Sequence, residues 1–260
     1  MIAAICLLRI YAHDKPELTT LEVEQWIRYM RYSGVDRVDL YDAYEASGEA
    51  IKDWHRGIDL PYVRYVDWHD HVPYNLHNTQ EAAYQHAIEH VNCTWHLAMD
   101  IDEYPFVPSD KEPNFLRRLM NRRTEAEYTF ENTVFSGDPL KKLWLPMRML
   151  QRFPRPINNL CKPIYKPSRV RAAKVHHNIL RGGRSVAFSD RTARMNHYWG
   201  GRLLGWGRDT NESLSNTVRD ESIASIIHRL RLGTPLVTPT LNVPITNKYF
   251  PRREEHRMEL

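Results

Sequence analysis

The sequence predicts an α/β fold with a mostly parallel sheet, and two observations support that prediction. In the first hundred residues, short apolar runs alternate with segments whose apolar residues recur at helical spacing, in the order strand, helix, strand, helix, strand, helix, strand. Strands that alternate with helices in this way form doubly wound parallel sheets. The composition agrees, because 42% hydrophobic and 26% charged residues in a chain of 260 can form one substantial core.

The opening elements follow from apolar spacing. Residues 2–8 are a continuous apolar run, typical of a central parallel strand that is covered on both faces. Thr19 and Glu22 fit a capping box, so we expect a helix to begin there, and the apolar residues from 23 to 30 continue it at helical spacing. Gly34 suits the position just after the end of that helix.

Three shorter elements precede a fourth strand. They are a strand over residues 35–41, a short helix over about 47–56 and a strand over 62–66. The first of these strands ends at Asp42. Asn78 and Glu81 form a second capping-box pattern, which predicts a helix that leads into a strand ending at Asp100.

The second half of the chain has a different pattern. Strands are expected over 129–135, 171–176 and 193–199, and a short helix over 115–120. Six prolines between positions 139 and 167 favour loops and antiparallel strands, which would form a substrate-covering region. Thr217 and Asp220 are expected to open a last helix, which Gly233 would close.

The segment Asp100-Ile101-Asp102-Glu103 is the strongest functional signal in the chain. It follows an apolar run over residues 95–99, so three carboxylates within four residues stand at the end of a buried strand. Like charges this close repel each other, and a divalent cation is the simplest resolution. Ligands of open α/β sheets bind at the carboxyl ends of the strands, so this Asp-x-Asp suggests a site for a metal and a phosphorylated substrate.

Other functions for this segment stay open, because an Asp-x-Asp triplet also occurs by chance in solvated loops. A two-metal phosphoesterase could combine the aspartates with the histidines at 69, 71, 176 and 177, although no motif of fixed metal-ligand spacing supports it. A non-catalytic glycan-binding or nucleic-acid-binding module is a third reading. Nucleotide dependence and turnover separate these functions, since a hydrolase needs no nucleotide and a binding module turns nothing over.

Net charge limits the kinds of partner that the chain could bind, and cysteine content indicates the redox compartment. The net charge of +4 suits an anionic substrate or an anionic membrane surface, and peripheral membrane association fits it, but it is too small to indicate nucleic acid. The three cysteines, Cys6, Cys93 and Cys161, are odd in number and far apart, which argues against a disulfide framework and favours a reducing compartment. No apolar stretch reaches transmembrane length.

A series of short motifs runs in order from about residue 5 to residue 200. The segments are Val23–Tyr29, Gly34–Asp36, Leu40–Asp42, Gln80–His86, Asp100–Tyr104, Lys162–Pro167, Val175–His177 and Met195–Tyr198. Together they resemble glycosyltransferase family 92. The chain departs from the family pattern in three places. A longer loop, Tyr11–Lys15, replaces Lys-Asn-Glu, Ala43 replaces an asparagine, and Gly200–Arg202 replaces Lys-Ser, so donor and acceptor choice could differ.

This resemblance implies a GT-A fold, in which a Rossmann-like nucleotide-binding half is merged with an acceptor half. It implies one catalytic domain over residues 1–233, with a nucleotide-sugar-binding half over 1–110 and an acceptor-side half over 111–233, followed by an extended tail over 234–260. It also implies a nucleotide-sugar donor, with UDP-galactose favoured, a divalent Mn²⁺ or Mg²⁺ ion, and transfer to a glycan acceptor with inversion.

The resemblance also assigns roles to residues of this chain. Asp102 is the expected direct metal ligand, Asp100 is expected to contact the ribose or the metal through a bound water, and His197 to reach the metal or the diphosphate from the other half. Further contacts to the donor are expected at Arg9, Asp14, Asp42, Gln80, Lys162 and His176. Structural alternatives stay open for several of them, namely a core histidine at 197, a surface or ion-paired arginine at 9, a helix cap at 42 and a solvated charge at 162.

Two further expectations concern the catalytic base and the location. An inverting transferase needs a base for the acceptor hydroxyl, and Asp138 and Glu131, which flank the end of a predicted strand, are the first candidates. Cysteine use and the absence of a signal-like N-terminal segment favour the cytoplasm. The alternative is a Golgi lumenal catalytic domain whose anchor has been removed.

Overall fold

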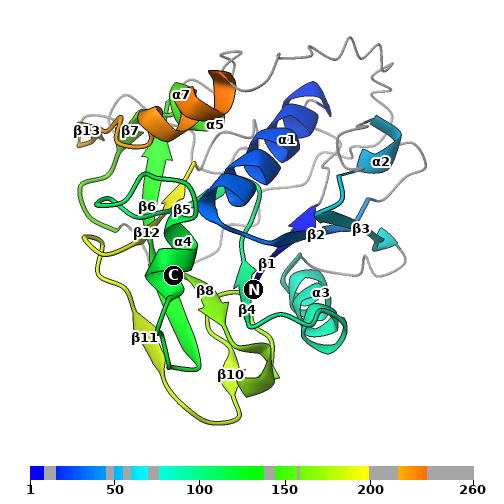
Figure 1. The fold of residues 1–260 in the computed structure, drawn as a ribbon. Helices are drawn as coiled ribbons and strands as arrows, with labels where there is room; N and C mark the ends of the chain where they lie inside the picture. Colours follow the sequence, from blue (N-terminus) through cyan, green and yellow to red (C-terminus); the bar gives the residue numbers. More distant parts are fainter. Residues whose placement is uncertain are drawn as a thin grey trace, which may run out of the picture.

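The computed structural model describes residues 1–8, 16–44, 50–54, 60–69, 76–137, 144–156, 159–198 and 216–232, with the side chains at 16–21, 54 and 76–78 excepted. Within these ranges the fold is α/β with a large, mostly parallel sheet, as the sequence predicts (Figure 1). The parallel strands are β1 (Ile2–Leu8), β2 (Arg37–Asp42), β3 (Val63–Asp67) and β4 (Trp95–Ala98), in the spatial order β4-β1-β2-β3. Their carboxyl ends therefore share one edge of the sheet.

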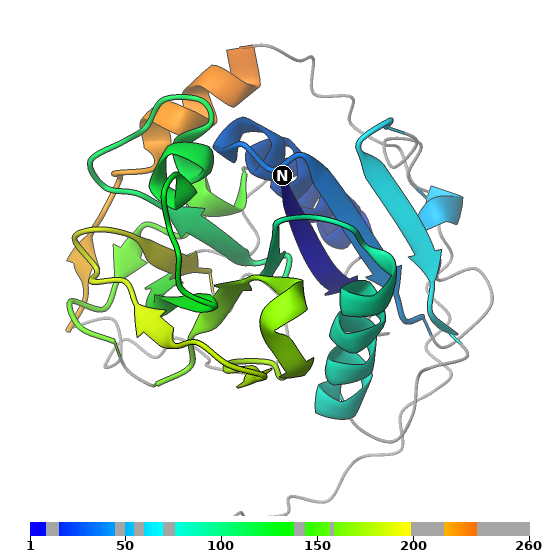
Figure 2. The ribbon, with the colours of Figure 1, turned by 60° about the horizontal axis from the view of Figure 1, so that its bottom comes forward.

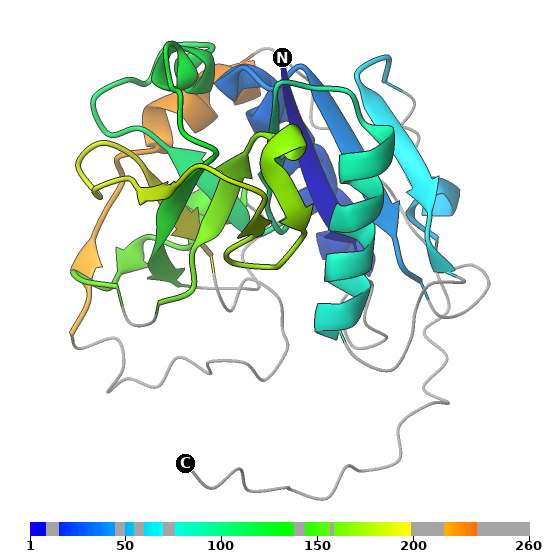
Figure 3. The ribbon, with the colours of Figure 1, turned by 90° about the horizontal axis from the view of Figure 1, so that it is seen from below.

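Two long helices cover opposite faces of this sheet (Figure 2 and Figure 3). They are α1 (Pro16–Ser33) and α3 (Leu76–His90). The even-numbered residues of β1 belong to the core cluster of Trp26 on α1, and the odd-numbered residues to the cluster of Tyr84 on α3. Side chains alternate along a strand, so the unbroken apolar run of β1 supplies both cores at once.

The second half extends the sheet with shorter strands. They are β5 (Glu103–Phe106), β6 (Glu127–Ser136), β7 (Gln151–Arg152), β8 (Lys162–Tyr165), β11 (Ser185–Ala187), β12 (Arg194–His197) and β13 (Val218–Arg219). β8 lies antiparallel between β4 and β6, and β12 lies parallel to β6 and antiparallel to β5. The remaining elements are α2 (Ile51–Trp54), α4 (Phe115–Met120), α5 (Leu145–Arg148), the 3₁₀ turn η3 (Pro167–Arg169), the β9 (Val170–Ala172) and β10 (Ile179–Leu180) pair, and α7 (Ala224–Leu232).

Both capping-box predictions place the helix start too late. Helix α1 begins at Pro16 and α3 at Leu76, so Thr19 and Asn78 lie inside their helices. Gly34, in contrast, has the left-handed conformation expected after α1, with φ of 105°. The carboxylates that suggested the caps bind cations elsewhere, because Glu22 pairs with Arg148 and Glu81 pairs with Lys174.

Two predictions for the second half are also wrong in extent. The strand expected over 171–176 ends at Ala172, because the Lys174 N–H donates to Asn178 Oδ1 at 3.0 Å and turns the chain back. The helix expected at Thr217 begins only at Ala224. Residues 218–219 instead pair with β7, and the Asp220 carboxylate accepts the Ser222 N–H at 2.8 Å.

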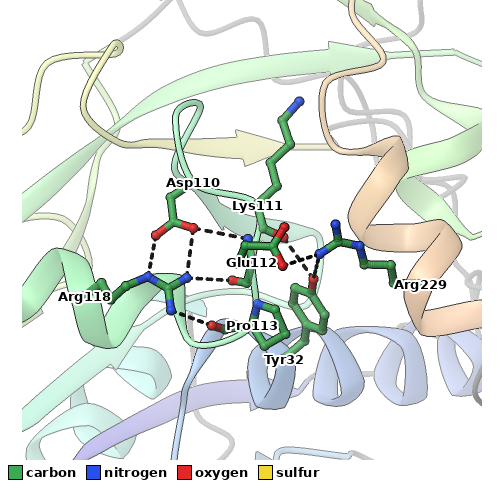
Figure 4. Close-up of polar contacts among 7 residues, drawn as sticks. All are labelled: Tyr32, Asp110, Lys111, Glu112, Pro113, Arg118 and Arg229. Atoms are coloured by element: carbon green, nitrogen blue, oxygen red, sulfur yellow. Dashed lines mark hydrogen bonds and ion pairs between the residues drawn. The ribbon is translucent and has the colours of Figure 1, made fainter.

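A polar cluster fastens α7 to α1 through the segment that follows β5 (Figure 4). Arg229 of α7 donates to Tyr32 Oη at 3.1 Å and to Glu112 Oε2 at 2.7 Å. The Tyr32 hydroxyl in turn donates to the Lys111 carbonyl at 2.9 Å. Arg118 of α4 holds the same segment through two bonds to Asp110, at 2.7 and 2.8 Å.

Helix α5 is held to α1 and to the end of β6 by buried contacts. Arg148 forms an ion pair with Glu22 in which neither side chain is more than 2% exposed, and the Leu145 N–H donates to Gln25 Oε1 at 3.0 Å. Gly137, which follows β6, is pressed against the same turn, since a Cβ there would lie 2.2 Å from the Arg148 carbonyl oxygen. These contacts fix the position of α5 relative to the carboxyl edge.

Cys6, Cys93 and Cys161 are all free thiols. Among the described helices, none combines the length and the apolar character that a membrane span requires.

Candidate functional site

The acidic segment forms the turn between β4 and β5, at the carboxyl edge of the parallel strands. β4 ends at Ala98, and the Glu103 N–H donates to the Asp100 carbonyl at 3.0 Å, which closes the turn. Ile101, between the two aspartates, is buried in the hydrophobic core and holds the turn against it. Asp100 and Asp102 are both partly exposed, so the two aspartates are the side chains that this turn presents at the edge.

Asp100 is held by two donors from other elements. Gln80 of α3 donates to Asp100 Oδ1 at 2.8 Å, and the Lys162 ammonium of β8 donates to Asp100 Oδ2 at 2.9 Å. Two residues expected at the donor site are therefore brought to the acidic turn, from positions far apart in the sequence. Each oxygen of the Asp100 carboxylate is thereby fixed by a hydrogen bond.

Glu103 is the buried member of the turn, with 2% exposure. Its Oε2 accepts the Asp100 N–H at 2.8 Å and lies 3.4 Å from Lys162 Nζ. Burial raises the pKa of Glu103 to about 7, against the opposing charge of Lys162. Burial would lower the pKa of Lys162, but Asp100 and Glu103 raise it well above its usual value, so the lysine is a permanent cation.

Asp102 faces His197, which comes from the end of β12. His197 Nε2 lies 3.7 Å from Asp102 Oδ2, and both side chains are slightly exposed, at 13% and 14%. The backbone sets this approach, because His197 pairs with Glu103 across the β12–β5 ladder and the Tyr198 N–H donates to the Asp102 carbonyl at 2.9 Å. Burial would lower the pKa of His197, but the Asp102 carboxylate raises it.

The Asp102–His197 pair fits a divalent ion. Carboxylate oxygen and imidazole nitrogen are both ligands of Mn²⁺, and Mg²⁺ is commonly held by one or two carboxylates together with substrate phosphates and water. The turn carries three carboxylates against one lysine, so a cation is attracted there. In the described part of the chain, no group of three or more His, Cys, Asp or Glu side chains could hold a metal.

Asp42 and His176 lie elsewhere along the same edge. Asp42 is fully buried, and its Oδ2 accepts the Ile51 N–H at 2.7 Å and the Tyr65 hydroxyl at 2.8 Å, so it supports α2 and β3. Burial raises the pKa of Asp42 to about 6. His176 is half-buried, and its Nδ1 lies 2.9 Å from the Cys161 carbonyl, directly beside Lys162 in the sequence.

Of the remaining predicted residues, the structure describes only Glu131. Glu131 lies in the middle of β6 opposite Arg194, three residue pairs back from the level of His197. Arg9, Asp14 and Asp138 lie outside the described residues.

Two of the histidines of the phosphoesterase reading, His69 and His177, contact other partners. His69 lies 2.8 Å from Asp67 and stacks on Tyr44, and His177 Nε2 lies 3.1 Å from the Cys161 sulfur. His71 lies outside the described residues. The geometry that is described therefore gives this reading no assembled two-metal site.

Glu103 is the residue of the site whose role the sequence did not indicate. It was expected only as a third acidic group, whereas it turns inward and braces the backbone of Asp100. No strand was predicted over Glu103–Phe106, so the sequence carried no signal for the inward direction of this side chain at the first residue of β5.

Comparison with known proteins gives one family. A sequence model of glycosyltransferase family 92 matches residues 11–232. No curated protein matches the chain.

Solved structures with a similar fold are distant in sequence. S. aureus TarS 1–349 in complex with UDP-GlcNAc is 9% identical, with a TM-score of 0.45, and the match covers 88% of this chain and 65% of that chain. HddC from Yersinia pseudotuberculosis complexed with GMP-PN is 11% identical, with a TM-score of 0.45, over 76% of this chain and 94% of that chain. The strand order and the family match define the fold class.

Proposed function

This chain belongs to glycosyltransferase family 92, and from that premise we propose that it transfers a sugar from a UDP-sugar to a glycan hydroxyl in a metal-dependent reaction with inversion. The observation that carries the proposal is the Asp102–His197 pair, which meets at the carboxyl edge of the parallel strands beside a braced Asp100. That edge is where open α/β sheets bind nucleotides.

Asp102 and His197 would hold the ion, and the donor diphosphate would complete its coordination. When bound, a divalent ion supplies Lewis-acid stabilisation of the charge that develops on the leaving diphosphate. Gln80 and Lys162 fix the Asp100 carboxylate, which would then present a defined oxygen to the ribose or to a metal-bound water. We propose Arg9, Asp14 and His176 as further contacts to the sugar-nucleotide donor. Galactose is the first donor sugar to test.

For the acceptor base we propose Asp138 before Glu131. Asp138 follows Ser136, the last residue of β6, by two positions. β6 runs parallel to β12, so its end lies on the side of the sheet where His197 stands. Glu131 lies about 10 Å back along β6 from the level of His197, given three residues at a rise of roughly 3.3 Å each.

Thermal unfolding tests this function with ligands in a matched set. Wild type, Asp102→Asn and the exposed control Asp190→Asn are heated with UDP, GDP, UDP-galactose or UDP-glucose, each with Mn²⁺ or with EDTA. A ligand that binds only the folded state raises the midpoint. We expect UDP and a UDP-sugar with Mn²⁺ to raise the midpoint of wild type and Asp190→Asn, and Asp102→Asn to lose that rise.

Product analysis then decides between the candidate functions. Release of UDP that depends on an added glycan, with a β-linked product from an α-linked donor, supports an inverting transferase. Metal-dependent release of phosphate without any nucleotide preference would favour a phosphoesterase. Glycan binding with no turnover of any UDP-sugar or GDP-sugar would contradict the proposal in favour of a binding module.

A further inference from the structure

Lys162 is a fully charged residue in an almost closed environment. Its side chain is only 2% exposed, at the start of β8 between the acidic turn and α3. Its ammonium lies 2.9 Å from Asp100 Oδ2 and 3.4 Å from Glu103 Oε2. A lysine this deep is not placed to meet solvent or to bind a substrate group directly, because both of its ionic partners belong to the protein.

The acidic turn needs a positive charge whether or not a metal is bound. Asp100, Asp102 and Glu103 stand within four residues, and burying an uncompensated carboxylate is costly. Lys162 compensates Asp100 and Glu103 with one charge, and the Gln80 amide completes the set of donors to Asp100. Asp102 stands outside this network and faces His197 instead.

We infer that Lys162 is a built-in counter-ion that assembles the acidic turn before a divalent ion arrives and restricts the protein ligands of that ion to Asp102 and His197. Lys162 is in this view a positioning residue that acts through Asp100 and Glu103. The inference rests on the proposed function, since it assigns a role toward the proposed ion. It also explains how three neighbouring carboxylates can stand in one folded turn without depending on a metal.

Two consequences distinguish this role from simple packing. With the lysine present, the carboxylates of Asp100 and Glu103 share one compensating positive charge, so a divalent ion gains less from them than from unopposed carboxylates. With its charge removed, the same carboxylates face a dication unopposed, and Coulomb attraction makes the turn bind the metal more tightly. Removing the charge of Lys162 should therefore lower the stability of the protein in EDTA and increase the stabilisation that a divalent metal gives.

The test is the thermal midpoint of Lys162→Met in EDTA, Mg²⁺ or Mn²⁺, without any nucleotide. Lys166→Met, which removes a lysine from the far end of the same strand segment, is the matched control. We expect Lys162→Met to have a lower midpoint in EDTA and a larger rise with Mn²⁺ than wild type, each tenfold gain in affinity adding roughly 3 to 5 °C. An equal Mn²⁺ shift in Lys162→Met and wild type would overturn the inference.

A second variant keeps the test decisive if Lys162→Met does not fold. Asp100→Asn leaves Lys162 paired with Glu103, so the Mn²⁺ shift of wild type should persist in it, whereas Asp102→Asn should lose the shift. Loss of the shift in Asp100→Asn would make Asp100 itself a metal ligand and would contradict the inference. These readouts need no sugar donor, so a failure of the counter-ion role is distinguishable from a failure of UDP-sugar transfer.

Discussion

Arg148 and Glu22 form an ion pair that is almost completely closed to solvent, with side-chain exposures of 0% and 2%. The pair joins α5 to α1, and so links the segment after β6 to the helix that covers the parallel sheet. Removing one partner of a buried pair leaves the other charge without compensation.

Arg148→Met is therefore expected to cost about 3 to 5 kcal/mol of unfolding free energy. In the double variant Glu22→Gln/Arg148→Met no charge is stranded, so it should recover a large part of that loss. Urea unfolding of the wild type, both single variants and the double variant gives the coupling energy. Additive single effects would show that the two residues do not depend on each other.

His96 makes the stability of the fold depend on pH. It is fully buried on β4, its Nε2 lies 2.9 Å from the Val91 carbonyl, and burial lowers its pKa from 6.5 to about 4. The unfolded chain takes up the proton first, so stability from this group is complete above pH 6.5 and is lost as the pH falls toward 4. The total is about 3 kcal/mol. His96→Gln should remove this loss, as urea midpoints measured from pH 4 to pH 7 would reveal.

Asp42 has the opposite effect in nearly the same range. Burial raises its pKa from 3.8 to about 6, so the folded protein holds this proton longer than the unfolded chain does. Stability from this group therefore falls as the pH rises from 3.8 to 6, by about 3 kcal/mol in total. We expect Asp42→Asn to show stability that rises with pH over this range more steeply than in wild type. An unchanged slope would contradict the assignment.

Gly137 is expected to tolerate no side chain. An added Cβ would lie 2.2 Å from the Arg148 carbonyl oxygen and 2.7 Å from Met149 Cα, and both are backbone atoms that cannot rotate away. Gly137→Ala should cost about 1 to 3 kcal/mol through forced backbone movement. Gly182→Ala is the control, because a Cβ at Gly182 meets nothing within 4 Å. Equal stability of the two variants in thermal unfolding would refute the close approach.

Apolar periodicity was enough to predict the parallel half of the fold, because a strand covered on both faces must be apolar along its whole length. The run over residues 2–8 matches β1 residue for residue. Helix starts were harder, since Glu22 and Glu81 have the residue type of a capping box while their charges pair with Arg148 and Lys174, far along the chain. Proline at position 16 was the better local signal for α1.

The sequence was enough to predict which residues of the candidate site lie at strand ends. It was not enough to predict which of them are buried. Asp100 and Asp102 follow a strand in the sequence itself, so their place at the carboxyl edge could be inferred. The sequence could not indicate that Lys162 is closed off from solvent, because that depends on how β8 lies between β4 and β6. Long-range strand pairing of this kind leaves no periodic trace.

The pairing of β5 with β12 also has a consequence for the order in which the protein is made. Asp102 leaves the ribosome long before His197, and at about 5 to 20 residues per second the acidic turn waits roughly 5 to 20 s for its partner. During that time the edge of β5 that later receives β12 has no partner strand, and open strand edges invite pairing with other chains. A nascent chain halted before Arg194 would carry the whole acidic turn and lack the Asp102–His197 pair.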